Sequence, residues 1–82
     1  MDKVPVIKVL WDAEAKVWVA ESDDIPGLAT EAPTMENLIQ KLKVIVPELL
    51  SLNKSFPIVD NKEIPIEILS RREEKIRLST SS

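Results

Sequence analysis

Apolar and polar residues alternate in two segments near the start of the chain, residues 4–11 and 16–22. Alternation with a period of two, in runs rich in β-branched and aromatic residues, predicts two half-buried strands. The short polar segment between them suits a hairpin connection. Trp11 and Trp18 lie symmetrically about this turn, so we expect them to pair across the strands. In the first strand one face carries Ile7, Val9 and Trp11, and the other carries Val6, Lys8 and Leu10.

A turn follows the second strand. Pro26 presets its own φ angle and Gly27 tolerates a positive φ, which together are typical of a type II turn. A short third strand is expected over residues 28–32, and Pro33 ends it.

After Pro33 the apolar residues recur every three or four positions, which predicts a helix. Thr34 is a favourable N-cap residue, and Glu36 places negative charge in the first turn, where the helix dipole favours it. The helix is expected to continue to about residue 52, with a kink at Pro47, because proline removes one backbone hydrogen bond. Its apolar stripe consists of Leu38, Leu42, Ile45, Val46, Leu49 and Leu50.

A fourth strand is expected over residues 63–70, after a loop at 54–62 that buries Phe56 and Ile58. Residues 76–78 form either a short fifth strand or the start of a frayed tail. The predicted fold is therefore α+β, a β-β-β-α-β sheet with one helix packed on one face. A right-handed crossover places the fourth strand parallel to the first, in the order 3-2-1-4. We assign residues 1–70 to one domain and 71–82 to a charged C-terminal extension.

Composition excludes several kinds of site. The 82 residues include no cysteine, no histidine and one glycine, Gly27. Disulfides, zinc–thiolate sites and glycine-rich phosphate loops are therefore excluded, and the usual side chain for acid–base catalysis near neutral pH is missing. We expect no metal and no cofactor. The lack of cysteines, of an apolar signal run and of an apolar stretch of about 20 residues indicates a cytoplasmic protein.

Charge is distributed unevenly along the chain, whose net charge is −3. Residues 12–37 contain seven acidic residues and one basic residue. Such a segment argues against nucleic acid as the main partner and suits a basic protein surface, although the same charges also keep a small domain in solution. The basic residues after position 70 are interrupted by Glu73 and Glu74, which favours a solvated tail over a nucleic-acid-binding motif.

Candidate catalytic groups are few. Asp23 and Asp24 form a carboxylate cluster with Glu21 nearby, but neighbouring residues on an extended chain point in opposite directions and are poorly placed to share a metal ion. Ser22 and Ser51 have no base partner that would activate them as nucleophiles. The sequence therefore predicts a protein that is not an enzyme.

The stretch from Val17 to Leu38 resembles the core of HicB-like antitoxins. In those proteins a strand is followed by an acidic residue and an apolar-Pro-Gly turn, then a short strand with a threonine, then a helix that begins Thr-x-Glu. Here Asp24-Ile25-Pro26-Gly27, Thr30 and Thr34-x-Glu36 occur in that order and spacing. With the first hairpin and the fourth strand, the resemblance covers residues 4–70 and looks closest to a short branch of the superfamily.

The resemblance implies a degraded RNase H-like fold without nuclease residues. Typical members neutralise a small basic mRNA-cleaving toxin of the HicA type by covering its active surface. Many also carry a C-terminal DNA-binding domain and repress their own operon. This chain ends about where that domain would begin, so autorepression through this chain alone is not expected.

Two functions stay open at this point. The first is a non-catalytic protein-binding domain of the antitoxin type, with charged contacts from Glu21, Asp23, Asp24 and Glu31 and apolar anchors at Trp18 and Ile25. The second is a homo-oligomeric structural or regulatory domain without a toxin, most simply a dimer, because a chain of this size buries little surface alone. A nuclease is a third alternative, which would need carboxylates that converge on one metal.

Overall fold

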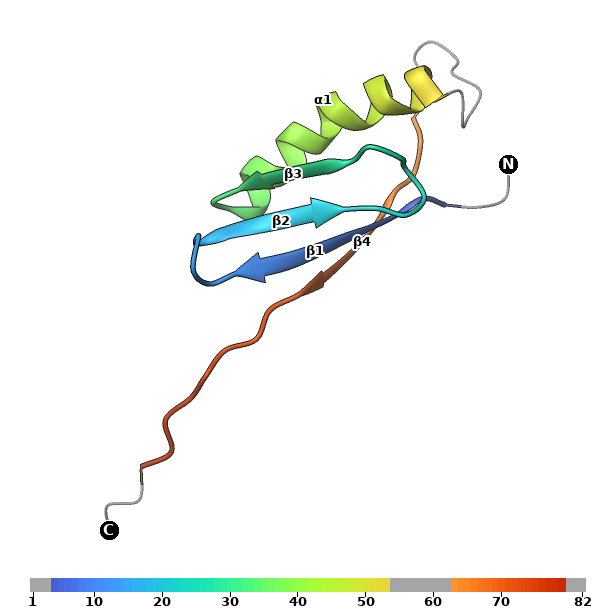
Figure 1. Cartoon of the computed structure of the whole chain (residues 1–82). Coiled ribbons are helices and arrows are strands. Elements are labelled where there is room, and N and C mark those ends of the chain that lie inside the picture. Colours follow the sequence, from blue (N-terminus) through green and yellow to red (C-terminus); the bar gives the residue numbers. More distant parts are fainter. Residues whose placement is uncertain (1–3, 54–62, 80–82) are drawn as a thin grey trace.

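A four-stranded sheet with one helix across one face makes up the computed structural model, which describes residues 4–53 and 63–79 (Figure 1). The elements are β1 (Val6–Asp12), β2 (Val17–Glu21), β3 (Ala29–Ala32), α1 (Met35–Asn53) and β4 (Glu67–Arg71). The sheet order is β3-β2-β1-β4, with β4 parallel to β1 and the other pairs antiparallel. The predicted α+β class, strand order and parallel fourth strand are confirmed.

The hairpin between β1 and β2 is organised by Asp12. Its carboxylate accepts hydrogen bonds from the backbone N–H groups of Glu14 and Ala15, at 3.0 and 3.1 Å. The Lys16 N–H closes the turn on the Asp12 carbonyl at 2.7 Å, and Lys16 has a positive φ of 58°. This turn sets the register that places Trp11 opposite Trp18, as the sequence predicts.

The turn between β2 and β3 has the geometry that Pro26 and Gly27 predict. The Leu28 N–H donates to the Ile25 carbonyl at 3.2 Å, and Gly27 has a φ of +87°. A positive φ at the third residue of the turn is what a type II turn requires. Ile25 and Leu28, at the two ends of this turn, are both buried.

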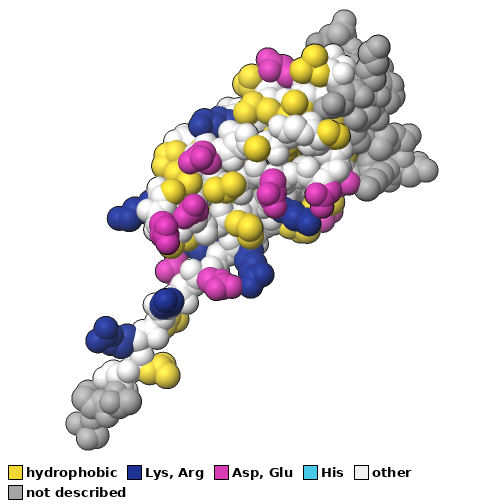
Figure 2. All heavy atoms as spheres, viewed as in Figure 1, with side chains coloured by type: hydrophobic (Ala, Val, Ile, Leu, Met, Phe, Trp, Pro, Cys, Tyr) yellow, Lys and Arg dark blue, Asp and Glu magenta, His cyan; other side chains and the backbone are white. Residues whose placement is uncertain are grey.

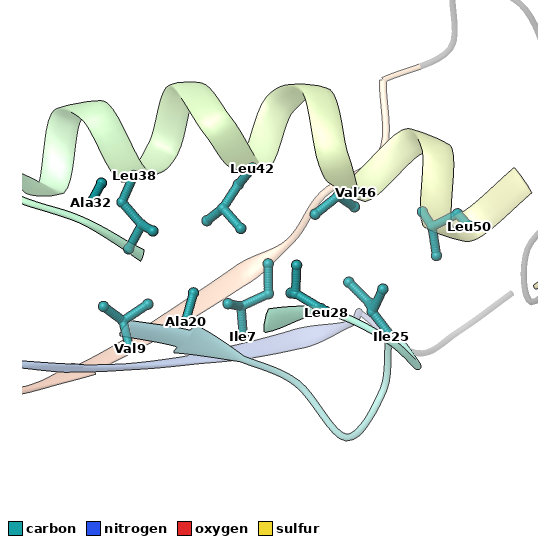
Figure 3. Packing of buried hydrophobic residues seen from close by; sticks show 10 residues of the cluster. All are labelled: Ile7, Val9, Ala20, Ile25, Leu28, Ala32, Leu38, Leu42, Val46 and Leu50. Atoms are coloured by element: carbon teal, nitrogen blue, oxygen red, sulfur yellow. The ribbon is translucent and has the colours of Figure 1, made fainter. Parts of the chain in front are cut away.

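α1 begins where Thr34 caps it. The Thr34 hydroxyl accepts a hydrogen bond from the Asn37 N–H at 3.1 Å, which satisfies one of the free N–H groups of the first turn. The helix continues through Pro47 to Asn53. Its most buried side chains recur every fourth residue and point at the sheet, as Figure 3 shows: Leu38, Leu42, Val46 and Leu50.

The core lies between α1 and one face of the sheet. Ile7, Val9 and Ala20 point up from the strands toward the helix, and Ile25 and Leu28 close the end nearest Leu50 (Figure 3). Full burial of a leucine or isoleucine side chain stabilises a fold by roughly 1.5–3 kcal/mol. α1 covers one face only, and no other helix or strand of the described residues covers the opposite face of the sheet.

One sequence prediction about the C-terminal part needs correction, and the structure decides between the two alternatives left open for residues 76–78. The fourth strand was expected from residue 63, but β4 begins at Glu67, whose N–H donates to the Pro5 carbonyl at 2.9 Å. Pro5 and Pro65 have no N–H, so the ladder cannot extend in that direction. No fifth strand occurs in the described residues 72–79, where all side chains are exposed. The predicted loop at 54–62, with Phe56 and Ile58, lies outside the described residues.

The two positive φ angles predict opposite responses to substitution. Gly27→Ala should lower the free energy of unfolding by about 1–2 kcal/mol, because a Cβ disfavours the left-handed region. Lys16→Gly should raise it by about 0.5 kcal/mol, since relief of the same strain outweighs the greater entropy of unfolded glycine. Chemical denaturation measures both. Exposed Lys43→Ala in α1 is the control, and equal effects of Gly27→Ala and Lys43→Ala would show that Gly27 is not conformationally required.

Candidate functional site

The face of the sheet opposite α1 is its largest uncovered surface, and we call it the open face. Residues that neighbour the buried ones along each strand point to this side, because successive strand residues alternate. The register brings Leu10 opposite Val19 and opposite Arg71, and Lys8 opposite Glu21 and Leu69. The open face consists of Val6, Lys8, Leu10, Asp12, Val17, Val19, Glu21, Ala29, Glu31, Glu67, Leu69 and Arg71.

The open face is acidic with an apolar centre. Its four carboxylates, from Asp12, Glu21, Glu31 and Glu67, outnumber its two cations, from Lys8 and Arg71. Leu10 is 46% exposed and Leu69 is 52% exposed, although both are large apolar side chains. Figure 2 shows acidic side chains interspersed with apolar ones over the body of the domain.

Three of the predicted contact residues lie on or beside this face. Glu21 and Glu31 are exposed, and the register Val19↔Glu31 and Glu21↔Ala29 makes them diagonal neighbours across β2 and β3. The side chain of Asp23 is 93% exposed and forms a 3.4 Å ion pair with Lys8. The structure therefore brings these three predicted acids to one region of the surface.

Asp24 has a different position from its neighbour. Its carboxylate accepts a hydrogen bond from the Val6 N–H at 2.8 Å, and the side chain is partly buried. Ser22 completes the connection, because its hydroxyl donates to the Val6 carbonyl at 2.6 Å and accepts from the N–H groups of Asp24 and Ile25. Asp24 and Ser22 thus join the turn after β2 to the start of β1.

Ile25 does not serve as the apolar anchor that the sequence suggested. Its side chain is 0% exposed and packs in the core beneath α1. The type II turn directs Ile25 inward, because the hydrogen bond from Leu28 folds the chain back over it. A partner protein cannot contact this side chain while the domain is folded.

Trp18 lies on the helix side of the sheet, near the hairpin. It packs partly against the core and meets Trp11 edge to face, with ring centroids 5.2 Å apart and planes at 61°. The Arg72 guanidinium lies 4.2 Å from the Trp11 centroid and 5.7 Å from that of Trp18. Arg72 also pairs with Glu74. Trp18 is therefore held in an intramolecular cluster with one cation above it.

Sequence reasoning missed three residues of this region. Ser22 was considered as a nucleophile without a base partner, and Arg72 was interpreted as part of a solvated tail. The third is Lys41, whose ammonium group donates to the Glu31 carbonyl at 2.7 Å and so fastens α1 to β3. The position of Arg72 could have been predicted from the sequence. Ile68, Ser70 and Arg72 are spaced two residues apart, so in an extended strand all three point to the side of the sheet that faces the helix.

Two properties of the described residues bear on what this site could do. Within residues 4–53 and 63–79, no group of three or more acidic side chains is placed to hold a metal ion. No helix in the described part of the chain is long and apolar enough to cross a membrane. What the open face offers to another molecule is carboxylates around exposed leucines.

The sequence of this chain matches one family of known proteins. The family described as "Domain of unknown function (DUF1902)" matches residues 4–80. The chain belongs to the DUF1902 family. A hypothetical protein, TTHA1013, from the extremely thermophilic bacterium Thermus thermophilus is similar to it in sequence and structure, with 46% identity and a TM-score of 0.65. The match covers 93% of this chain and 100% of that one. Comparison with curated proteins gave no match.

The neighbouring aspartates of this DUF1902 domain should differ in stability effects. Asp24→Ala leaves the Val6 N–H without its charged acceptor and should lower the free energy of unfolding by about 1–2 kcal/mol. Asp23→Ala removes one exposed ion pair and should cost about 0.5 kcal/mol or less. Urea denaturation followed by circular dichroism measures both. Equal losses would mean that the Asp24 carboxylate does not tie the turn to β1.

Arg72→Ala should change the tryptophan emission of the DUF1902 domain, because both tryptophans lie beneath this guanidinium. The expected loss of stability is about 0.5–1 kcal/mol, the usual range for an exposed cation–π contact. Arg72→Lys should have a smaller effect, since it retains the charge. Arg77→Ala, another exposed arginine in the C-terminal part, is the control and should leave the emission spectrum unchanged.

Proposed function

We propose that this DUF1902 domain is a non-catalytic protein-binding domain of the HicB-like antitoxin type. Its partner would be a small, basic, mRNA-cleaving toxin, bound over the open face. The observation that carries the proposal is the group of exposed carboxylates, Glu21, Asp23 and Glu31, beside an apolar centre that no described helix covers. A cytoplasmic location is part of the proposal, because a chain without cysteines suits a reducing compartment.

The composition of the open face suits such a partner. Interfaces combine an apolar centre with a polar rim. Here Leu10 and Val19 lie opposite each other on the two inner strands, Leu69 lies on the edge strand β4, and Glu21, Glu31 and Glu67 lie around them. Opposite charge on two surfaces speeds their encounter and orients them. An enzyme that cleaves mRNA must itself present a basic surface to phosphate groups, so carboxylates can occupy the place of its substrate.

The fold supports the same proposal. A degraded RNase H-like domain of the HicB type is expected to have an antiparallel hairpin, a third strand and a helix that leads to a parallel fourth strand. The order β3-β2-β1-β4 with α1 between β3 and β4 is consistent with that topology. The motif residues of the resemblance have structural roles here, since Gly27 makes the type II turn and Thr34 caps α1.

The alternative, a homo-oligomeric regulatory domain without a toxin, is favoured by a different feature. Residues 73–79 extend away from the domain with Ile76 and Leu78 almost fully exposed. A second copy of the chain could cover them. This feature is compatible with either function, because it lies outside the Glu21, Asp23 and Glu31 region.

The proposal predicts that charge reversal on the open face weakens toxin binding. The tagged full chain is used to isolate a small basic protein from its source cells, and the isolated protein is tested for mRNA cleavage. The domain should inhibit that cleavage, and the double variant Glu21→Lys, Glu31→Lys should bind at least tenfold more weakly, a loss of about 1.4 kcal/mol. Titration calorimetry and a cleavage assay measure the two effects.

The matched control is the double variant Glu36→Lys, Glu48→Lys, which changes the net charge equally but on exposed positions of α1. It should bind the toxin with a small loss that disappears at high salt, since only long-range attraction is reduced. The proposal is wrong if the two double variants bind equally, or if no basic protein isolated with the chain cleaves mRNA.

A further inference from the structure

The C-terminal arm, residues 73–79, is the least covered described segment of the chain. It continues from β4 and extends away from the sheet, and every side chain in it is exposed (Figure 1). The radius of gyration is 16.3 Å, whereas a compact chain of this length has about 12 Å. The longest dimension, 63 Å, is more than twice the other two, 24 and 20 Å.

The arm has the residue pattern of a strand that is buried on one side. Ile76 and Leu78 are 83% and 84% exposed, and in an extended chain they point to the same side. Lys75 and Arg77 point to the other side. An apolar and charged alternation of this kind is typical of a strand that packs against another surface. Among residues 4–53 and 63–79, no element covers Ile76 or Leu78.

A concave surface with apolar and acidic side chains lies next to the residues where the arm leaves β4. A hollow of about 540 Å³ at the hairpin end of the sheet is lined by Leu10, Trp11, Asp12, Ala13, Glu14 and Val19. A second hollow of about 490 Å³ shares Leu10, Trp11 and Ala13 with the first and extends to Arg71, Glu73, Glu74 and Lys75. We call the first of these the hairpin hollow. Its floor is apolar, and its two charged side chains, Asp12 and Glu14, are both acidic.

The arm and the hairpin hollow are complementary in charge. The outer part of the arm carries Lys75 and Arg77 without an acid between them, and Figure 2 shows basic and apolar side chains along it. Long lysine and arginine side chains can reach acids at the rim while neighbouring apolar side chains fill the floor. Ile76 and Leu78 lie beyond the residues that line the hollows of their own chain, so the hairpin hollow of another molecule can receive them.

We propose that two copies of this chain exchange arms, so that Ile76 and Leu78 of one copy occupy the hairpin hollow of the other. Arm and hollow lie next to each other on each copy, so one two-fold axis satisfies both contacts at once. The same exchange brings Lys75 and Arg77 of each copy near Asp12 and Glu14 of its partner. Burial of additional apolar surface suits a small domain whose core has a single helix.

A second copy fits the arm better than a basic toxin does. The outer arm is basic, so a basic protein would meet like charge there, which disfavours association. The toxin surface proposed at Glu21, Asp23 and Glu31 does not include the arm, but the hairpin hollow shares Leu10, Asp12 and Val19 with the open face. A bound toxin would therefore compete with arm exchange, which does not itself require a toxin. Loss of arm exchange and loss of toxin binding remain distinguishable by different variants.

Light scattering and sedimentation of the full chain over a range of concentrations test the exchange. The wild type should form a dimer, and the double variant Ile76→Asp, Leu78→Asp should raise its dissociation constant at least tenfold. Val44→Asp with Leu52→Asp replaces two exposed apolar residues of α1 and should leave the constant within about twofold. Circular dichroism checks that all three proteins are folded, which is expected because every substituted side chain is exposed.

Cross-linking identifies the contact directly, because the chain has no cysteine of its own. Equal amounts of the single variants Ala13→Cys and Leu78→Cys, one of them tagged, are mixed and oxidised. The mixed disulfide dimer should form at least tenfold faster than in the control mixture of Val44→Cys and Leu78→Cys. A monomer at all concentrations, a dimer insensitive to the arm substitutions, or equal cross-linking in the two mixtures would each overturn the proposal.

Discussion

Four side chains of α1, Leu38, Leu42, Val46 and Leu50, lie against Ile7, Val9 and Ala20 of the sheet, and the rest of the molecule is arranged around this contact. The chain has no cysteine to form a disulfide, so burial of apolar surface must offset most of the entropy lost on folding. Spacing of four residues keeps the stripe on one side of α1. Thr34 and the Pro26-Gly27 turn set where the helix begins and how the strands beneath it approach.

In the described part of the chain, α1 covers one face of the sheet and leaves the other uncovered. The opposite face carries Leu10 and Leu69 among carboxylates, and the strand order leaves β3 and β4 at the edges. Lys41 protects one edge by bonding the Glu31 carbonyl, whereas β4 continues into an uncovered arm. Exposed edges and apolar faces are where proteins meet other chains. The architecture therefore leaves surface of this kind available on the open face and along the arm.

Much of the fold could be predicted because it depends on local patterns. Alternation identified β1 and β2 and paired Trp11 with Trp18, and the helical period identified the side chains that α1 buries. The start of β4 was placed too early, because the alternation of Ile64 and Ile66 continues before Glu67 while the ladder cannot pass Pro5. The candidate site was predicted less well. Glu21, Asp23 and Glu31 are exposed as expected, but Ile25 is a core residue and Asp24 binds a backbone N–H.

The sequence by itself determined the element types, the turn at Gly27, the cap at Thr34 and the exclusion of cysteine and histidine chemistry, because these follow from residue identity and short-range spacing. Only the tertiary structure decided which of two adjacent aspartates is structural, since that depends on Val6, 18 residues away in sequence, lying beside the turn. The same holds for Arg72, which lies over two tryptophans contributed by a distant hairpin. The periodicity of a sequence predicts to which side of its own helix or strand a side chain points. Which residues that side chain then contacts depends on which distant segments the packing of the core brings together.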